Sequence, residues 1–205
     1  KSGKVDLMHT RILCFVLAML LVPLAGCARN EPASIFQDTD ITGAEFGRDF
    51  SLTDHTGQPR RLADYKGKVL VLFFGYTQCP DVCPTTLMGM AEVMKLLGKA
   101  AANVQVLFIT LDPERDTKDL LAAYVTQFDP SFVGLYGDKP TTAATALGFK
   151  VFFQKQPGST PKTYSIDHSA NSYIYDPQGK LRLYVKHGEE PAKIAADIKL
   201  LLDGR

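Results

Sequence analysis

A run of six apolar residues, 69–74, leads into Cys79 and Cys83, and a helix-like pattern begins near Pro84. A strand with apolar residues on both faces fits the interior of a parallel sheet that is covered on both sides. The start of a helix stabilises a thiolate, because backbone N–H groups and the helix dipole both favour negative charge there. We therefore predict an α/β fold in which a central strand carries two reactive thiols at its end.

Strand and helix patterns alternate along the rest of the chain. We expect a small hairpin at 50–62, strands at 104–111, 132–136, 172–176 and 181–186, helices at 84–98, 117–128, 140–148 and 191–201, and a polar loop at 154–163. This order, with a cysteine pair after the first core strand, is similar to the thioredoxin arrangement. The predicted fold is thioredoxin-like, with a mixed central sheet flanked by helices and an added N-terminal hairpin.

The N-terminal segment has the pattern of a signal peptide. Basic residues precede an apolar run of eleven residues, 12–22, which is shorter than the roughly 20 residues that span a bilayer. The run ends in Leu-Ala-Gly-Cys27, which resembles the lipobox of bacterial lipoproteins. We expect a lipoprotein signal peptide at 1–26, lipidation of Cys27, a tether at 27–44 and one domain at 45–205. The alternative is an ordinary signal peptide or short anchor in which Cys27 has no role.

Charge and cysteine content limit the classes of function. The net charge is +1 and no block of like charge occurs, so the sequence gives no reason to expect nucleic acid or a basic membrane-binding patch. Cys14 lies in the apolar run and would be removed with the signal peptide. Cys79 and Cys83 would then be the free thiols of the mature protein, in an oxidising compartment.

Three residues separate Cys79 from Cys83, whereas thioredoxin-type redox sites have two. On a helix start this spacing puts both side chains on one face, which permits either a disulfide or a shared metal ion. Soft thiolates select Cu(I) or zinc, and two thiolates require a further ligand. His55 and His187 are interpreted as surface residues, whereas His168 directly precedes a predicted hairpin strand that a thioredoxin-like topology places against the cysteines. A structural role for His168 stays open on these grounds alone.

Three blocks of sequence, taken together, resemble the Sco/SenC family. They are Thr77-x-Cys-Pro-Asp-Val-Cys-Pro-Thr-Thr-Leu87, Asp112-Pro-Glu-Arg-Asp-Thr117, and Asp167-His-Ser169 followed by Tyr173-Ile-Tyr-Asp-Pro-Gln-Gly179. The resemblance covers the chain from about residue 45 to the C-terminus. It implies a thioredoxin-like fold that binds one copper ion, as Cu(I) or Cu(II), and serves assembly of the binuclear copper centre of cytochrome c oxidase. It also implies that the copper ligands are Cys79, Cys83 and His168.

Two functions follow as hypotheses. The first is a copper chaperone whose partner is the copper-accepting subunit of cytochrome c oxidase, with periplasmic copper chaperones and thiol reductants as further partners. The second is a thiol–disulfide oxidoreductase that reduces the oxidase cysteines through a reversible Cys79–Cys83 disulfide. The expected location is the bacterial cell envelope, with a lipid anchor and the domain on the extracytoplasmic, periplasmic side.

Neighbouring polar and sulfur-containing residues have simpler interpretations. Met90 and Met94 lie on the apolar stripe of the predicted helix, so we expect them to fill the core rather than bind copper. Residues 112–117 have the pattern of a strand exit followed by a helix cap. Asp167 is adjacent to His168, and it has either the imidazole ring or a nearby backbone group as its expected hydrogen-bond partner.

Overall fold

The computed structural model describes residues 34–158, 160 and 163–205. The predicted signal peptide and the predicted lipidation of Cys27 lie outside these residues. In the part of the chain that the structure describes, no helix is both long and apolar enough to cross a membrane.

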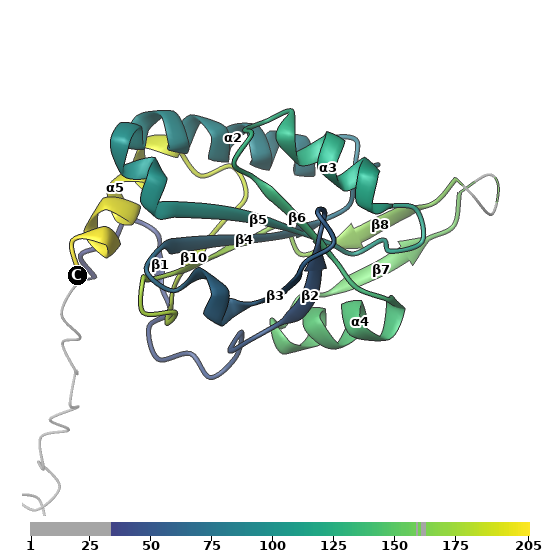
Figure 1. The fold of residues 1–205 in the computed structure, drawn as a ribbon, viewed down its shortest axis with the longest axis horizontal. Helices are drawn as coiled ribbons and strands as arrows, with labels where there is room; N and C mark the ends of the chain where they lie inside the picture. Colours follow the sequence, from purple (N-terminus) through teal and green to yellow (C-terminus); the bar gives the residue numbers. More distant parts are fainter. Residues whose placement is uncertain (1–33, 159, 161–162) are drawn as a thin grey trace, which may run out of the picture. The chain divides into compact units, whose positions relative to one another are not determined.

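The centre of the domain is a mixed sheet (Figure 1). Its strands are β1 (Thr39–Asp40), β2 (Ser51–Asp54), β3 (Pro59–Arg61), β4 (Val69–Gly75), β5 (Val104–Thr110), β6 (Val133–Tyr136), β9 (Ser172–Tyr175) and β10 (Leu181–Val185), in the spatial order β1-β10-β9-β4-β5-β6-β2-β3. Strands β4, β5 and β6 are parallel, and the other neighbours pair in antiparallel fashion.

Helices cover both faces of this sheet. They are α2 (Val82–Leu97), α3 (Lys118–Thr126), α4 (Lys139–Gly148) and α5 (Pro191–Leu202), with short 3₁₀ helices η1 (Leu62–Tyr65) and η2 (Gly98–Asn103). Helices α2 and α3 lie on one side of the sheet and α4 on the other (Figure 1). The arrangement is the predicted thioredoxin-like α/β fold, which confirms that prediction.

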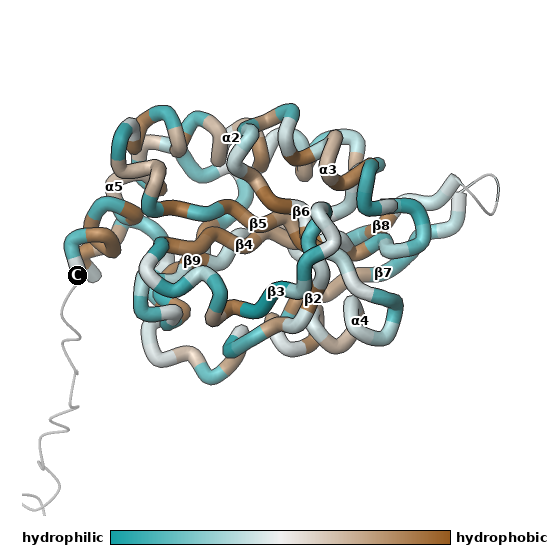
Figure 2. The backbone as a smooth tube through the Cα atoms, in the orientation of Figure 1, coloured by the Kyte–Doolittle hydropathy of each residue, from teal (hydrophilic) through white to brown (hydrophobic). Residues whose placement is uncertain are grey.

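Strand β4 divides its side chains between two hydrophobic cores. Its odd-numbered residues, such as Phe73, pack with α2, α3 and α5, and its even-numbered residues, such as Phe74, pack with α4 and the N-terminal hairpin. All seven residues of β4 are buried, and Figure 2 shows the hydrophobic colour concentrated on β4 and β5. A strand buried on both faces has to be apolar throughout, which is why the uninterrupted run 69–74 identified it.

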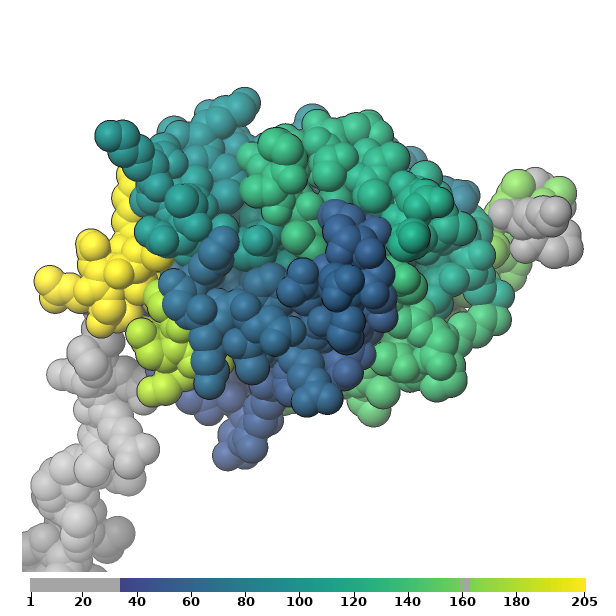
Figure 3. Space-filling model, in the orientation of Figure 1, coloured from purple at the N-terminus to yellow at the C-terminus, as the bar shows by residue number. Residues whose placement is uncertain are grey.

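The predicted N-terminal hairpin is present as β2 and β3, and β2 also pairs with β6 at the edge of the sheet. In the space-filling view this hairpin (blue) forms part of the surface that faces the reader (Figure 3). The segment before it is also ordered by the domain, because Thr39–Asp40 form β1 on the outer side of β10. The expected tether at 27–44 therefore overlaps the folded part of the chain.

The prediction of a polar loop at 154–163 is wrong for its first three residues, which belong to a strand. Strands β7 (Phe153–Gln156) and β8 (Ser165–His168) form a separate antiparallel hairpin, in which Phe153 pairs with His168. Three of the four residues of β7 are polar, and none of the four is fully buried. A strand in a two-stranded hairpin at the surface needs no apolar run, so hydrophobic periodicity could not identify it.

Candidate metal centre

The two cysteines lie on either side of the start of α2. Strand β4 ends at Gly75, and the Cys79 amide closes a turn by donating to the Tyr76 carbonyl at 3.2 Å. Helix α2 begins at Val82, so Cys83 is in its first turn and Cys79 precedes it. The sulfurs therefore converge through this turn, and the expectation that both cysteines share one face of a helix is wrong.

Gly75 allows the Cys83 sulfur to approach the end of β4. A Cβ atom at position 75 would lie 2.7 Å from Cys83 Sγ and 2.9 Å from the Phe108 ring. Both contacts are much shorter than van der Waals distances, so a larger residue at position 75 would displace the sulfur. Cys83 is completely buried, whereas Cys79 is partly exposed.

The third member of the site is His168, the last residue of β8. Its Nδ1 atom lies 2.9 Å from the Ser169 carbonyl oxygen, and its Nε2 atom lies 3.5 Å from Cys83 Sγ. A carbonyl oxygen can only accept, so Nδ1 carries the proton and donates, which leaves the Nε2 lone pair facing the sulfur. Phe73 and Tyr76 contact the imidazole edge-to-face at centroid distances of 6.3 and 5.9 Å. The ring is therefore fixed in both tautomer and orientation.

The sulfur atoms of Cys79 and Cys83 and a ring nitrogen of His168 all lie within 4.8 Å of one another. Metal–sulfur and metal–nitrogen bonds of about 2.0–2.3 Å place the donors around one ion about 4 Å apart. The three groups therefore fit a single ion after a small contraction. Two sulfurs and one imidazole nitrogen are a soft donor set, which suits Cu(I) or zinc and disfavours magnesium and calcium.

The two thiols differ strongly in acidity. The hydrogen bond from Cys83 lowers the pKa of Cys79 to about 3, against the opposing effect of burial. The same hydrogen bond and burial raise the pKa of Cys83 well above its ordinary value. At neutral pH the pair therefore consists of a partly exposed Cys79 thiolate and a buried Cys83 thiol.

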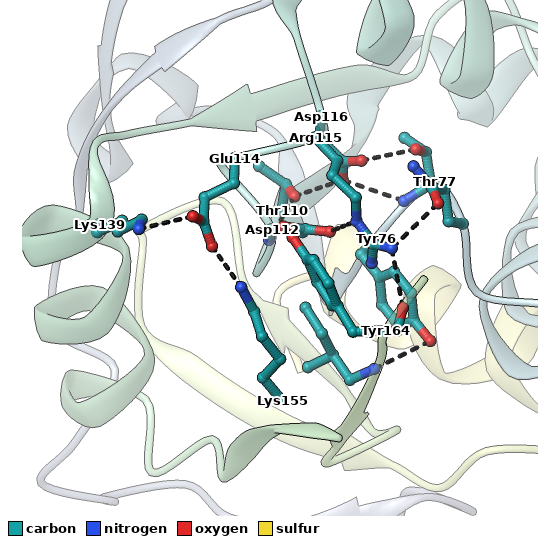
Figure 4. A network of polar contacts seen from close by, with 12 residues as sticks. Tyr76, Thr77, Thr110, Asp112, Glu114, Arg115, Asp116, Lys139, Lys155 and Tyr164 are labelled. Atoms are coloured by element: carbon teal, nitrogen blue, oxygen red, sulfur yellow. Dashed lines mark hydrogen bonds and ion pairs between the residues drawn. The ribbon is translucent and has the colours of Figure 1, made fainter. Parts of the chain in front are cut away.

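Residues 112–117 contact the cysteine-bearing turn through Asp116 and Thr77 (Figure 4). The buried Asp116 carboxylate accepts hydrogen bonds from Thr77 N at 3.0 Å, Thr77 Oγ1 at 2.6 Å and Thr110 Oγ1 at 2.5 Å. Burial raises the pKa of Asp116, although these hydrogen bonds oppose the shift. The Thr117 side chain caps α3 by accepting from Leu120 N, which confirms the predicted helix cap.

The other histidines and methionines lie outside the cluster. His55 is half-buried and accepts a hydrogen bond from Gly134 N through Nδ1 at 3.0 Å, so it joins the N-terminal hairpin to β6 rather than facing only solvent. His187 is exposed, as predicted, and its Nδ1 lies 3.0 Å from Thr86 Oγ1. Met90 and Met94 are buried in the core, which confirms their predicted role.

The contacts around His168 differ from the predicted ones in one case, and two further contacts were not predicted. Asp167 accepts a hydrogen bond from Gln156 Nε2 across the β7–β8 hairpin at 2.7 Å, rather than contacting the imidazole or a nearby backbone group. The imidazole is oriented instead by the carbonyl of Ser169, and a backbone acceptor has no signature in the sequence. Tyr76 was also missed: its hydroxyl accepts from Ile166 N at 3.2 Å.

Comparisons with known proteins agree on one family. The family model described as SCO1/SenC matches residues 38–203. The mitochondrial SCO1 homolog of Mus musculus is 38% identical over 74% of this chain and 54% of its own length, and a SCO2-like protein of Rickettsia felis is 36% identical over 80% and 75%. The match thus spans about half of the mouse protein. A structure of Bradyrhizobium japonicum ScoI with copper bound superposes with a TM-score of 0.71 at 39% identity, covering 78% of this chain and 100% of that one. The chain therefore belongs to the SCO1/SenC family.

Proposed function

We propose that this protein binds one copper ion through Cys79, Cys83 and His168 and delivers it to the binuclear copper centre of cytochrome c oxidase. The observation that carries the proposal is the convergence of two sulfurs and one imidazole nitrogen within 4.8 Å. The copper-bound structure of the Bradyrhizobium japonicum relative supports copper as the metal.

The chemistry of the donors suits a copper carrier. Two sulfurs and one nitrogen match the low coordination number that Cu(I) accepts, and the partly exposed Cys79 gives a recipient protein access to the ion. Loading requires both cysteines to be reduced and Cys83 to lose its proton, so copper binding depends on redox state and pH. Copper is thus the cargo of the protein, and the state of the thiol pair controls loading and release.

The cellular setting follows from the family and the N-terminal sequence. The recipient is the copper-accepting subunit of the oxidase, and periplasmic copper chaperones and thiol reductants are further partners. Residues 1–26 are removed as a lipoprotein signal peptide, Cys27 is lipidated, and the tether that begins at residue 27 holds the domain at a membrane of the bacterial cell envelope, on the extracytoplasmic side.

A second function is favoured by the unequal thiols. The exposed Cys79 thiolate can attack a disulfide of the target, and Cys83 can then resolve the mixed disulfide. The products are a Cys79–Cys83 disulfide and two target thiols, so two electrons pass to the target. This reaction requires both cysteines but not His168, which distinguishes it from copper delivery.

The test is a copper titration of the reduced full chain, compared with Cys79→Ala, Cys83→Ala and His168→Ala. We expect one copper per wild-type chain and a loss of affinity of at least about 100-fold in each variant, since removing a ligand costs more than removing its supporting contact. His187→Ala is the matched control, because this exposed histidine lies outside the cluster.

The same variants separate the two functions. Copper transfer to the apo copper domain of the oxidase should require all three residues. Reduction of an oxidised oxidase domain should require only the two cysteines. Unchanged copper affinity in His168→Ala would refute the three-ligand site, and full copper transfer by His168→Ala would favour the oxidoreductase as the main role.

A further inference from the structure

Arg115 belongs to a polar network that includes Tyr76, Asp112 and Tyr164 (Figure 4). It follows β5 in the loop 112–117, and its side chain is only 13% exposed. Its Nε atom forms an ion pair with Asp112, which is 1% exposed. A buried charged side chain requires further hydrogen-bond partners, and the two partners of Nη1 belong to two different segments of the chain. Nη2 is buried and has no hydrogen-bond partner.

The first segment is the turn that carries the cysteines, and the second is the hairpin that carries His168. Arg115 Nη1 donates to Gln78 Oε1 at 3.1 Å, in the residue directly before Cys79. It also donates to the Tyr164 carbonyl at 2.8 Å, directly before β8. The guanidinium carbon lies 3.5 Å from the centroid of the Tyr164 ring, which is a close cation–π contact. One side chain therefore joins the two halves of the site.

The β7–β8 hairpin depends on such contacts for its position. Its two strands pair with each other and not with the eight-stranded sheet, among the residues that the structure describes. Other contacts that attach it to the loop 112–117 and to the end of β4 are Tyr164 OH to Asp112 Oδ1 at 2.6 Å, Ile166 N to Tyr76 OH at 3.2 Å and the Lys155–Glu114 ion pair. Because the hairpin lacks the hydrogen bonds of the main sheet, these side chains fix the strand that ends in His168.

We propose that Arg115 is a positioning residue for copper binding, which sets the place of the His168 imidazole relative to the two sulfurs. The inference rests on the proposed copper site, since it assigns no ligand role to Arg115 itself. Ligand-supporting contacts of this kind determine metal affinity, because they hold the donor where the ion needs it.

The geometry of the contacts requires the guanidinium and not only its charge. Arginine presents several N–H donors in one rigid plane, and here that plane bonds to Asp112 and two other oxygens while lying against an aromatic ring. A lysine would keep the charge beside Asp112 but could not reproduce this fork. If Arg115 acted on the cysteines only through its positive charge, Arg115→Lys would keep the copper affinity of the wild type.

The first experiment measures copper affinity of the reduced full chain in Arg115→Lys and Arg115→Gln. We expect a loss of about 10- to 100-fold in both, as is typical when a supporting contact of a metal ligand is removed. Arg182→Gln is the matched control: Arg182 is 17% exposed and pairs with the buried Asp176 away from the cluster. The copper affinity of Arg182→Gln should equal that of the wild type. If Arg115→Gln does not fold, Arg115→Lys still provides the test.

The second experiment asks whether Arg115 acts through the imidazole. In a His168→Ala background, Arg115→Lys should cause no further loss of copper affinity, because the ligand that Arg115 positions is already gone. In the metal-free chain, Arg115→Lys should accelerate hydrogen exchange of the Ile166 amide, which donates to Tyr76. The amide of Ile174, in the central sheet, should exchange as in the wild type.

Several results would overturn the proposal. The first is a wild-type copper affinity in Arg115→Lys, and the second is a loss of copper affinity in Arg182→Gln as large as that in Arg115→Lys. The third is that Arg115→Lys lowers copper affinity in the His168→Ala background as much as it does in the wild type. The fourth is that Arg115→Lys leaves hydrogen exchange of the Ile166 amide unchanged. Failure of the proposed function looks different, because the wild type itself would then fail to bind copper. The exchange measurement needs no metal, so it would still decide whether Arg115 holds the hairpin.

Discussion

At the scale of single residues, the candidate site is asymmetric. Cys79 is partly exposed and ionised, whereas Cys83 is buried, protonated and hydrogen-bonded to its partner. A metal ion that binds both sulfurs has to displace the Cys83 proton, so loading releases acid. In the proposed function, the exposed Cys79 is the group that a recipient protein or a target disulfide meets first.

The low pKa of Cys79 predicts reactivity in acid. The Cys79 thiolate should be alkylated by iodoacetamide at about pH 5 nearly as fast as at neutral pH, where an ordinary thiol is almost entirely protonated. Removing the main cause of the shift with Cys83→Ala should raise the pKa of Cys79 and slow the reaction at this pH. The rates can be followed by mass spectrometry of the metal-free chain.

The Cys79→Ser variant is the control for this measurement, since of the Cys79–Cys83 pair it leaves only the buried thiol. Equal alkylation at about pH 5 in wild type and Cys83→Ala would contradict the assigned cause. The sequence predicted a stabilised thiolate at a helix start, but not which cysteine would carry it. That choice depends on the burial of Cys83 and on its hydrogen bond to Cys79, which the tertiary packing of the domain determines.

At the scale of the elements, the parts of the fold differ in how well the sequence predicted them. Strand β4 and helix α2 bury wide apolar surfaces, so their periodicity identified them. The β7–β8 hairpin is held by Arg115, Tyr164 and other long-range polar contacts, which leave no periodic signal. For this reason the strand that carries His168 was missed, although the predicted topology and the family resemblance both pointed to His168 itself.

The N-terminal hairpin offers a test of how one carboxylate organises an element. Asp54 is 2% exposed and accepts hydrogen bonds from Thr56, from Gln58 N and from Arg60 Nε. Burial alone would raise its pKa, but these hydrogen bonds outweigh it and lower the pKa of Asp54 to about 2. Asp54→Ala leaves several buried donors without a partner, so we expect a loss of about 1–3 kcal/mol in the free energy of unfolding.

The pH dependence of this loss has a definite sign. A depressed carboxyl pKa contributes stability above the unfolded pKa of about 4, and the contribution is lost as the pH falls through about 2. The difference between wild type and Asp54→Ala in chemical denaturation should therefore shrink over this range. Asp203→Ala, at an exposed position, should show no such difference. A constant difference down to about pH 2 would contradict the assignment to the ionised carboxylate.

At the scale of the whole molecule, a carboxyl pair joins the two ends of the described domain. Asp197 in α5 is fully buried and accepts hydrogen bonds from Gln37 N and Asp38 N. The Asp38 side chain is itself buried beside Asp197, and the charged groups that face it are Asp197, Glu189 and Lys193. Burial, and then the negative charge of Asp197, raise the pKa of Asp38 to about 7.

This raised pKa predicts that the attachment of β1 weakens as the pH rises. Protonated Asp38 is favoured in the folded state, so its stabilising contribution is present below the unfolded pKa of about 4 and is lost as the pH rises through about 7. Asp38→Asn keeps a neutral side chain of the same shape. We therefore expect the variant to match the wild type in stability at about pH 4 and to exceed it at about pH 8.

Hydrogen exchange locates the effect within the molecule. The measured quantity is hydrogen exchange of the β1 amides, Thr39–Asp40, after correction for the intrinsic pH dependence of exchange. As the pH rises between these two values, this exchange should accelerate in the wild type but not in Asp38→Asn. The amides of β4 report on global unfolding and are the internal reference. Because β1 lies within the expected tether at 27–44, its release would lengthen the free part of this tether without disturbing Cys79, Cys83 or His168. Equal pH dependence of β1 exchange in the two proteins would show that Asp38 does not control this attachment.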